Sequence, residues 1–256
     1  ASYAREFSEV IRPRENAVFG TEGDRDGDGD VWLLITDIQG PVAGYFSPGD
    51  PNGRDLLYLD VSAGITVAAH EFNHMILHNY DAGEHGFVSE GLAQWAEVDL
   101  YGNPRQNTHM AYFESRTDTS LDWVYYADDA FENLARYGVG YVYTQYFSSH
   151  FGGDGAAGVL LRDGLSMDPS QNHRSKGKDG VTQALGLLGY NETFRDVFPD
   201  WCLANLMDDP GYGDGSYGYP DLDVRTDLTH SADTFPDTFD GDLNPWAAEF
   251  HSFSGA

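Results

Sequence analysis

Two histidines and a glutamate form the pattern His-Glu-x-x-His, at His70, Glu71 and His74. If this segment is a helix, residues four apart project from one face, so both imidazoles can bind a single zinc ion. The carboxylate of Glu71 would then lie beside the metal, where it can take a proton from a metal-activated water. The pattern therefore predicts a zinc site able to hydrolyse a peptide bond.

A catalytic zinc ion usually has a third protein ligand, and Glu90 is our candidate. It lies sixteen residues after His74. A second helix that begins near Glu90 and packs antiparallel to the first, after a short glycine-containing connection, would bring its carboxylate back to the zinc. We therefore predict His70, His74 and Glu90 as zinc ligands and Glu71 as the general base.

The residues around the motif predict the helix that must hold it. Apolar side chains recur at helical spacing over residues 62–80, and Ser62 is a suitable N-cap. Two histidines and a glutamate on so apolar a helix would be costly to bury without a metal. The alternative is a core helix whose two histidines are hydrogen-bonded and bind no metal.

The two zinc motifs, His-Glu-x-x-His and the run Ser-Glu-Gly-Leu-Ala-Gln-Trp-Ala-Glu over residues 89–97, resemble the gluzincin peptidases. Their third zinc ligand is such a glutamate. The chain is most similar to the hyicolysin family of secreted bacterial metallopeptidases, with a weaker similarity to the aminopeptidase group. The resemblance extends over most of the chain, but only the zinc motifs are specific. It implies an α+β, two-lobed zincin-like fold and a zinc-dependent endopeptidase.

Two positions depart from the gluzincin pattern. Ser89 stands where the residue before the third ligand is commonly Asn, and Gln94 stands where thermolysin-like enzymes have an Asp that orients a ligand histidine. Gln94 or Glu97 could orient that histidine instead. We interpret His78 and His85 as structural or rim residues, because three ligands from one straight helix would splay too far apart.

Peptide hydrolysis also needs a donor for the oxyanion that forms opposite the zinc. Gluzincins of the aminopeptidase group use a tyrosine in a Tyr-x-x-Gly setting, and this resemblance assigns the role to Tyr137. Tyr141 is the next candidate. The alternative is that both are core aromatics of one helix, together with Tyr143 and Tyr146.

Four aspartates alternate with other residues in one short segment, at Asp24, Asp26, Asp28 and Asp30. A glycine follows at the sixth position, as in an EF-hand loop, but Ile35 replaces the glutamate of position twelve. The segment is therefore not an EF-hand, although calcium could recruit another carboxylate such as Asp37. We name the four aspartates as candidate calcium ligands; the alternative is a solvated acidic turn.

The 256 residues include 42 acidic and 14 basic side chains, for a formal net charge of −28. This charge would repel a phosphate backbone and so argues against nucleic-acid binding. No apolar run reaches membrane-spanning length, so we expect no membrane association. We also expect a protein or peptide substrate and a monomer. The negative field would favour basic substrates at low salt.

The kinds of acidic residue bear on the environment of the protein. Aspartates outnumber glutamates by 30 to 12 and only two residues are lysines, which suits a surface solvated in high salt. The first residues are not a signal peptide, and we expect a mature or excised form of a secreted protein. Calcium-binding aspartate clusters fit an exported protein too.

The rest of the chain predicts the elements that position the site. Strands are expected over residues 31–38 and 56–61, with a turn-rich segment over 44–53, and helices over residues 88–100, 135–151, 181–188 and 191–207. Residues 208–242 are expected to be irregular. This pattern divides the chain into a β-rich N-terminal lobe that ends in the zinc-binding helix (1–86) and a mainly helical C-terminal lobe (87–256), together one catalytic domain.

Three functions fit these features. In a zinc endopeptidase, an extended substrate would lie between the lobes and pair with an edge strand near residues 44–46 or 56–60. An aminopeptidase needs acidic groups for the free amine, and no Gly-x-Met-x-Asn segment of the kind aminopeptidases use is visible. The third is a non-catalytic, calcium-dependent binding module with a peptidase-like fold. The intact Glu71 argues against it.

Overall fold

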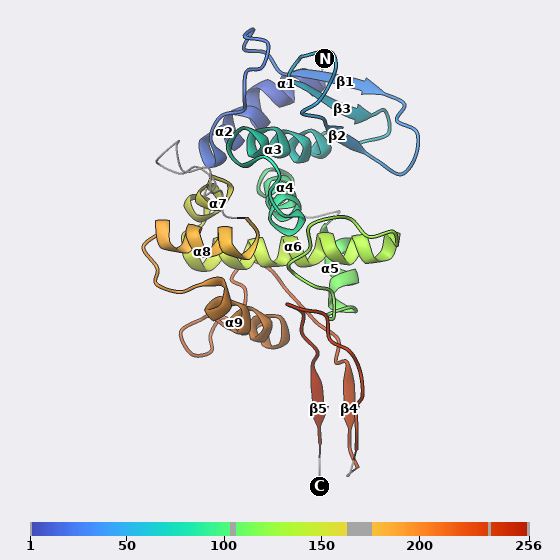
Figure 1. The fold of residues 1–256 in the computed structure, drawn as a ribbon, viewed down its shortest axis with the longest axis vertical. Coiled ribbons are helices and arrows are strands. Elements are labelled where there is room, and N and C mark those ends of the chain that lie inside the picture. Colours follow the sequence, from blue (N-terminus) through green and yellow to red (C-terminus); the bar gives the residue numbers. More distant parts are fainter. Residues whose placement is uncertain (1, 103–105, 163–175, 235–236, 255–256) are drawn as a thin grey trace.

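The computed structural model describes residues 2–102, 106–162, 176–234 and 237–254. It is a mixed α/β structure, with a three-stranded sheet near one end, helices through the middle and a two-stranded sheet extending at the other end (Figure 1). The helical segments are α1 Ser2–Glu6, η1 Phe7–Ile11 (a π-helix), α2 Arg12–Phe19, α3 Thr66–Asp81, α4 Gly86–Tyr101, α5 Gln106–Glu114, α6 Ala130–Phe151, α7 Asp154–Arg162, α8 Lys178–Leu187 and α9 Phe194–Met207. The strands are β1 Trp32–Thr36, β2 Gly44–Phe46, β3 Leu56–Asp60, β4 His230–Ala232 and β5 His251–Phe253.

The three-stranded sheet has the order β1-β3-β2, with β1 parallel and β2 antiparallel to β3. Side chains alternate between its faces, which places Leu57 and Leu59 together on one face, where both are fully buried. The strands predicted over 31–38 and 56–61 are confirmed. Because β3 lies between two partners, the expectation that residues 56–60 could pair with a substrate is wrong, whereas β2 is an edge strand.

The first nineteen residues differ from the expected β-rich pattern, because residues 2–19 form the successive helical segments α1, η1 and α2. Phe7, Ile11 and Val18 are buried. Phe7 packs edge-on against Phe72 of α3, with 5.0 Å between ring centroids. The N-terminal part is therefore a small sheet and a helical segment that both support α3.

The motif helix α3 begins at Thr66 after an N-cap at Ile65, three residues later than the predicted N-cap. Ser62 is not its N-cap, because the Ser62 backbone N–H and hydroxyl both donate to the carboxylate of Asp60 in the preceding turn. After a short connection, α4 runs from Gly86 and packs against α3. The two helices that carry the zinc motifs are thus neighbours in space, as the sequence predicts.

The predicted helices over 135–151, 181–188 and 191–207 are confirmed as α6, α8 and α9. Helix α4 crosses α6 with almost no space between the backbones. A Cβ atom on Gly91 would lie 2.5 Å from the carbonyl oxygen of Gly140 and 2.3 Å from the hydroxyl of Thr144. Only glycine permits this approach. The contact therefore fixes the position of α4 relative to α6, one residue after Glu90. In the described ranges, no helix is long and apolar enough to cross a membrane.

This crossing predicts that Gly91→Ala destabilises the protein by about 1–3 kcal/mol, because the added methyl group overpacks the interface. Urea unfolding of the two proteins measures the difference. Gly186→Ala in α8 is the matched control, since a Cβ atom there meets open space. Equal stability of the Gly91 variant and the native protein would show that the helices can separate freely.

Candidate metal centre

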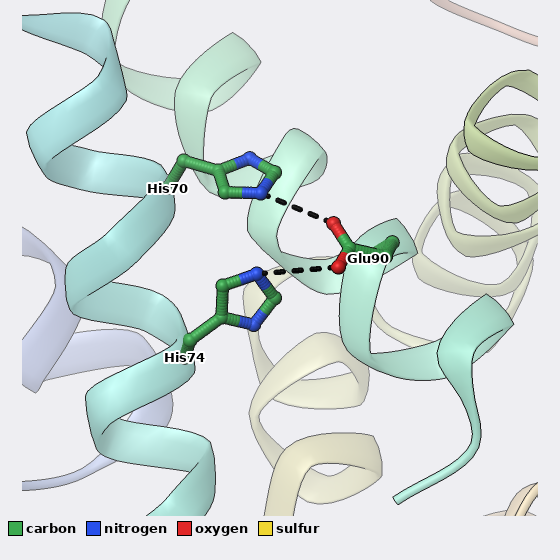
Figure 2. Close-up of side chains that lie close together, drawn as sticks. All are labelled: His70, His74 and Glu90. Carbon is green, nitrogen blue, oxygen red and sulfur yellow. Dashed lines mark hydrogen bonds and ion pairs between the residues drawn. The ribbon is translucent and has the colours of Figure 1, made fainter. Parts of the chain in front are cut away.

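Three potential metal ligands converge between α3 and α4. The Nε2 atom of His70 lies 3.1 Å from Oε2 of Glu90, and the Nε2 atom of His74 lies 3.5 Å from Oε1 of the same carboxylate (Figure 2). One ligand atom from each residue lies within 4.8 Å of the other two. Two imidazole nitrogens and one carboxylate oxygen are a donor set that zinc uses in catalytic sites, so the residues present fit that metal.

The other ring nitrogen of each histidine has its own partner. Nδ1 of His70 lies 2.8 Å from a carboxylate oxygen of the buried Glu97, and Nδ1 of His74 lies 3.1 Å from the hydroxyl of Ser89. When Nδ1 carries the proton, Nε2 presents its lone pair toward Glu90, the orientation a metal ligand needs. Of the two residues expected to orient a ligand histidine, Glu97 makes the contact.

Gln94 contacts residues of α5 and α6 instead. Its amide nitrogen donates to the backbone carbonyl of Tyr137 at 2.8 Å, and its oxygen contacts Nδ1 of His109. Gln94 is fully buried and ties α4 to α5 and α6. The orienting role proposed for it is therefore wrong, and Ser89, which we noted only as a departure from the pattern, has that role for His74.

Charge in this centre is balanced within the protein. Burial alone would lower the pKa of His70, but hydrogen bonds to Glu90 and Glu97, together with their charges, raise the pKa to about 10. Burial alone would raise the pKa of Glu90, but the charge of His74 and the hydrogen bonds from both histidines hold it well below its usual range. A proton on His70 thus compensates the buried carboxylates when no cation is bound.

Glu71 lies on the same helix, and only 7% of its surface is exposed. Burial, and to a lesser extent the charge of Glu90, raise the pKa of Glu71, while the two histidines and the backbone N–H of Phe46 act in the opposite direction. Strand β2 runs close by, since a Cβ atom on Gly44 would lie 3.3 Å from Cγ of Glu71. The carboxylate therefore lies between the two histidines and an edge strand.

Tyr126 is a site residue that the sequence analysis missed. Its hydroxyl donates to Oε1 of Glu90, although 57% of the residue surface is exposed. Burial of the hydroxyl and the charge of Glu90, followed by the neighbouring Tyr137, raise the pKa of Tyr126. It lies on the long connection between α5 and α6, where no periodicity marks a residue, and only the folded loop brings it to the centre.

Tyr137 contacts Tyr126, with 6.0 Å between ring centroids, and stacks on His109. Its oxyanion role stays a prediction. The second candidate, Tyr141, is almost fully buried and lines a different cavity with Asp99 and Asp154.

His78 and His85 are not part of the group of three potential ligands. His78 is exposed and contacts Phe46, with 5.8 Å between ring centroids. His85 precedes α4, and its Nδ1 lies 3.1 Å from a carboxylate oxygen of Asp122. Both positions agree with their interpretation as structural or rim residues.

The aspartate-rich segment forms a separate cluster. Carboxylate oxygens of Asp24, Asp26 and Asp28 lie within 4.8 Å of one another, and all three residues are exposed. Asp30 and Asp37 are not part of this group. The guanidinium of Arg54 contacts two members, at 3.4 Å from Asp26 and 3.1 Å from Asp28. The positive charge of Arg54 thus already lies beside the cluster.

Comparison of the chain with known proteins finds no matching family model and no matching curated protein. The function must therefore be argued from the geometry of the centre.

The contact between Glu97 and His70 predicts that Glu97→Gln lowers zinc affinity by about 10–100-fold, because the amide no longer holds the Nδ1 proton through a charged hydrogen bond. Competition with a chelator measures the dissociation constant. Glu9→Gln, an exposed change on the N-terminal helical segment, is the control with the same change in charge. Equal affinities in all three proteins would contradict the orienting role of Glu97.

Proposed function

We propose that the protein is a zinc-dependent endopeptidase of the gluzincin type. The observation that carries this proposal is the convergence of His70 and His74 from α3 with Glu90 from α4, beside the buried carboxyl of Glu71. A bound zinc ion supplies a Lewis acid that activates water and polarises the scissile carbonyl. Side chains of the protein would carry out the proton transfers and stabilise the oxyanion.

In this proposal Glu71 is the general base. Burial raises its pKa from the usual range of a glutamate, which matches it better to proton transfer near neutral pH. Glu71 takes a proton from the attacking water and passes it to the nitrogen of the leaving amine. The backbone of Phe46 in β2 favours the ionised form of this carboxyl, which is the form that accepts the proton.

Tyr126 is the residue we favour as the donor to the oxyanion. Its hydroxyl donates to Glu90, one of the residues that would hold the cation, and would be available to donate to a substrate carbonyl if that carboxylate bound a metal. Tyr137 is its neighbour and the second candidate. A phenol with a raised pKa keeps its proton and therefore remains a donor at neutral pH.

The substrate would be an extended peptide that pairs with the free edge of β2. The sheet with α3 would then form one wall of a cleft between two lobes, and α4 with α6 the other. We further propose that the enzyme is a secreted monomer and works in a salt-rich medium, as its charge of −28 and paucity of lysine suggest.

Calcium is proposed as a second cofactor, bound by Asp24, Asp26 and Asp28. Three carboxylates in reach of one ion are a common start for a calcium site, which takes six to eight oxygen ligands. Asp24 also lines a cavity with Phe46 and His78, so calcium there would order one side of the cleft.

Replacement of the general base separates metal binding from catalysis. We expect Glu71→Gln to retain one zinc ion per chain, because no ligand changes, and to lose at least about 100-fold in kcat. Zinc content by atomic emission and cleavage of a quenched-fluorescent peptide are the two measurements. Full activity in this variant would refute the mechanism, and a wild-type protein without zinc would favour the non-catalytic binding module.

Loss of the Tyr126 hydroxyl is expected to act on the transition state. Tyr126→Phe should lower kcat by about 100-fold with little change in KM or zinc content, since the donor matters only when the oxyanion forms. Tyr125→Phe is the matched control, because Tyr125 is 81% exposed. An unchanged kcat in the Tyr126 variant would contradict this role and leave Tyr137 as the candidate donor.

Calcium binding predicts a rise in Tm when millimolar calcium is added, because a ligand that binds only the folded state stabilises it. Asp28→Asn should remove most of that rise, and Asp233→Asn, outside the cluster, should not. Differential scanning calorimetry with magnesium as the parallel cation measures the effect. The same Tm with and without calcium would mean that Arg54 suffices to neutralise the cluster.

A further inference from the structure

A groove of about 180 Å³ adjoins the metal centre. His74 and Ser89, which belong to the centre, line one part of it. Phe46, Pro48 and Leu77 give it apolar walls. A groove of this size can take one long side chain, and that side chain would lie beside His74 and Ser89 of the metal centre.

Two acidic residues also line the groove: Asp81, the last residue of α3, and Glu84 of the α3–α4 connection. Asp81 is fully buried, and one of its oxygens accepts a hydrogen bond from Nζ of Lys176 at 2.7 Å. One oxygen of Glu84 accepts hydrogen bonds from the backbone N–H groups of Gly177, at 2.7 Å, and His85. The second oxygen of each carboxylate is shielded from water and has no hydrogen-bond partner.

The two acidic residues of the groove differ in their ion pairs. Lys176 neutralises Asp81, whereas Lys178 pairs with Asp122, and Glu84 forms no ion pair among the described residues. Burial raises the pKa of Glu84 to about 7, with a contribution from Asp81 and opposition from Lys176 and the backbone donors. A buried carboxylate oxygen without a partner is costly, and a cationic group entering the groove would remove that cost.

We propose that this groove binds a lysine or arginine side chain of the substrate, next to the scissile bond, and that Glu84 determines this specificity. The apolar walls contact the aliphatic stem, and the two carboxylates attract the charged head. The net charge of −28 favours the approach of a basic peptide. This inference rests on the proposed peptidase function, because the zinc centre defines where the scissile bond lies.

Peptides that differ by a single ammonium group test the proposal. One N-acetylated, quenched-fluorescent sequence carries lysine, arginine or norleucine on either side of the scissile bond; norleucine keeps the stem without the charge, and acetylation excludes recognition of a free α-amine. We expect kcat/KM to be at least about tenfold higher for lysine than for norleucine, and Glu84→Gln to abolish most of that ratio. Glu9→Gln, with the same change in net charge far from the groove, should keep it.

Binding to a catalytically impaired variant separates this inference from the peptidase proposal. Fluorescence anisotropy with zinc-loaded Glu71→Gln should show at least about tenfold tighter binding of the lysine peptide than of its norleucine analogue, and Glu84→Gln in that background should remove the difference. If the wild type cleaves nothing but this binding difference holds, the peptidase proposal fails and the groove assignment stands. Equal binding of the two peptides, or a preference that survives Glu84→Gln, would overturn the assignment.

Discussion

The carboxylate of Glu90, held between the imidazoles of His70 and His74, is the interaction on which the rest of the structure depends. Burying an anion in a helical core is costly unless a cation lies beside it. Helices α3 and α4 must therefore keep a fixed position relative to each other. The close backbone contact between Gly91 and Gly140 fixes α4 against α6, and the three-stranded sheet packs against α3.

Electrostatics link this packing to the proposed function. Without a metal, a proton on His70 offsets the surrounding carboxylates, as its raised pKa of about 10 indicates. A divalent cation would displace that proton and meet ligands already oriented by Glu97 and Ser89. Such a centre would need little rearrangement to bind a metal, and the burial of this region also raises the pKa of Glu71.

The motif helix and its partner helix could be predicted, because the spacing of four residues and the return of a second helix follow from helical geometry alone. For the residue that orients a histidine, the sequence left Gln94 and Glu97 as alternatives, and only the fold shows that Glu97 makes the contact. Tyr126 could not, because it reaches Glu90 only through the path of an irregular loop. The start of α3 was missed since Ser62 bonds locally to Asp60, an alternative open to any serine in a turn. The N-terminal helical segment was missed because its few buried residues, such as Phe7 and Ile11, are spread among charged ones.

The central claim is that one zinc ion binds between α3 and α4, and X-ray absorption spectroscopy of the zinc-loaded protein tests it most directly. The account predicts a four-coordinate ion with two imidazole nitrogens at about 2.0–2.1 Å and oxygen donors at about 2.0–2.2 Å. His74→Ala should remove one imidazole from that shell. A spectrum with sulfur in the shell, or one that His74→Ala leaves unchanged, would contradict the assignment of this centre.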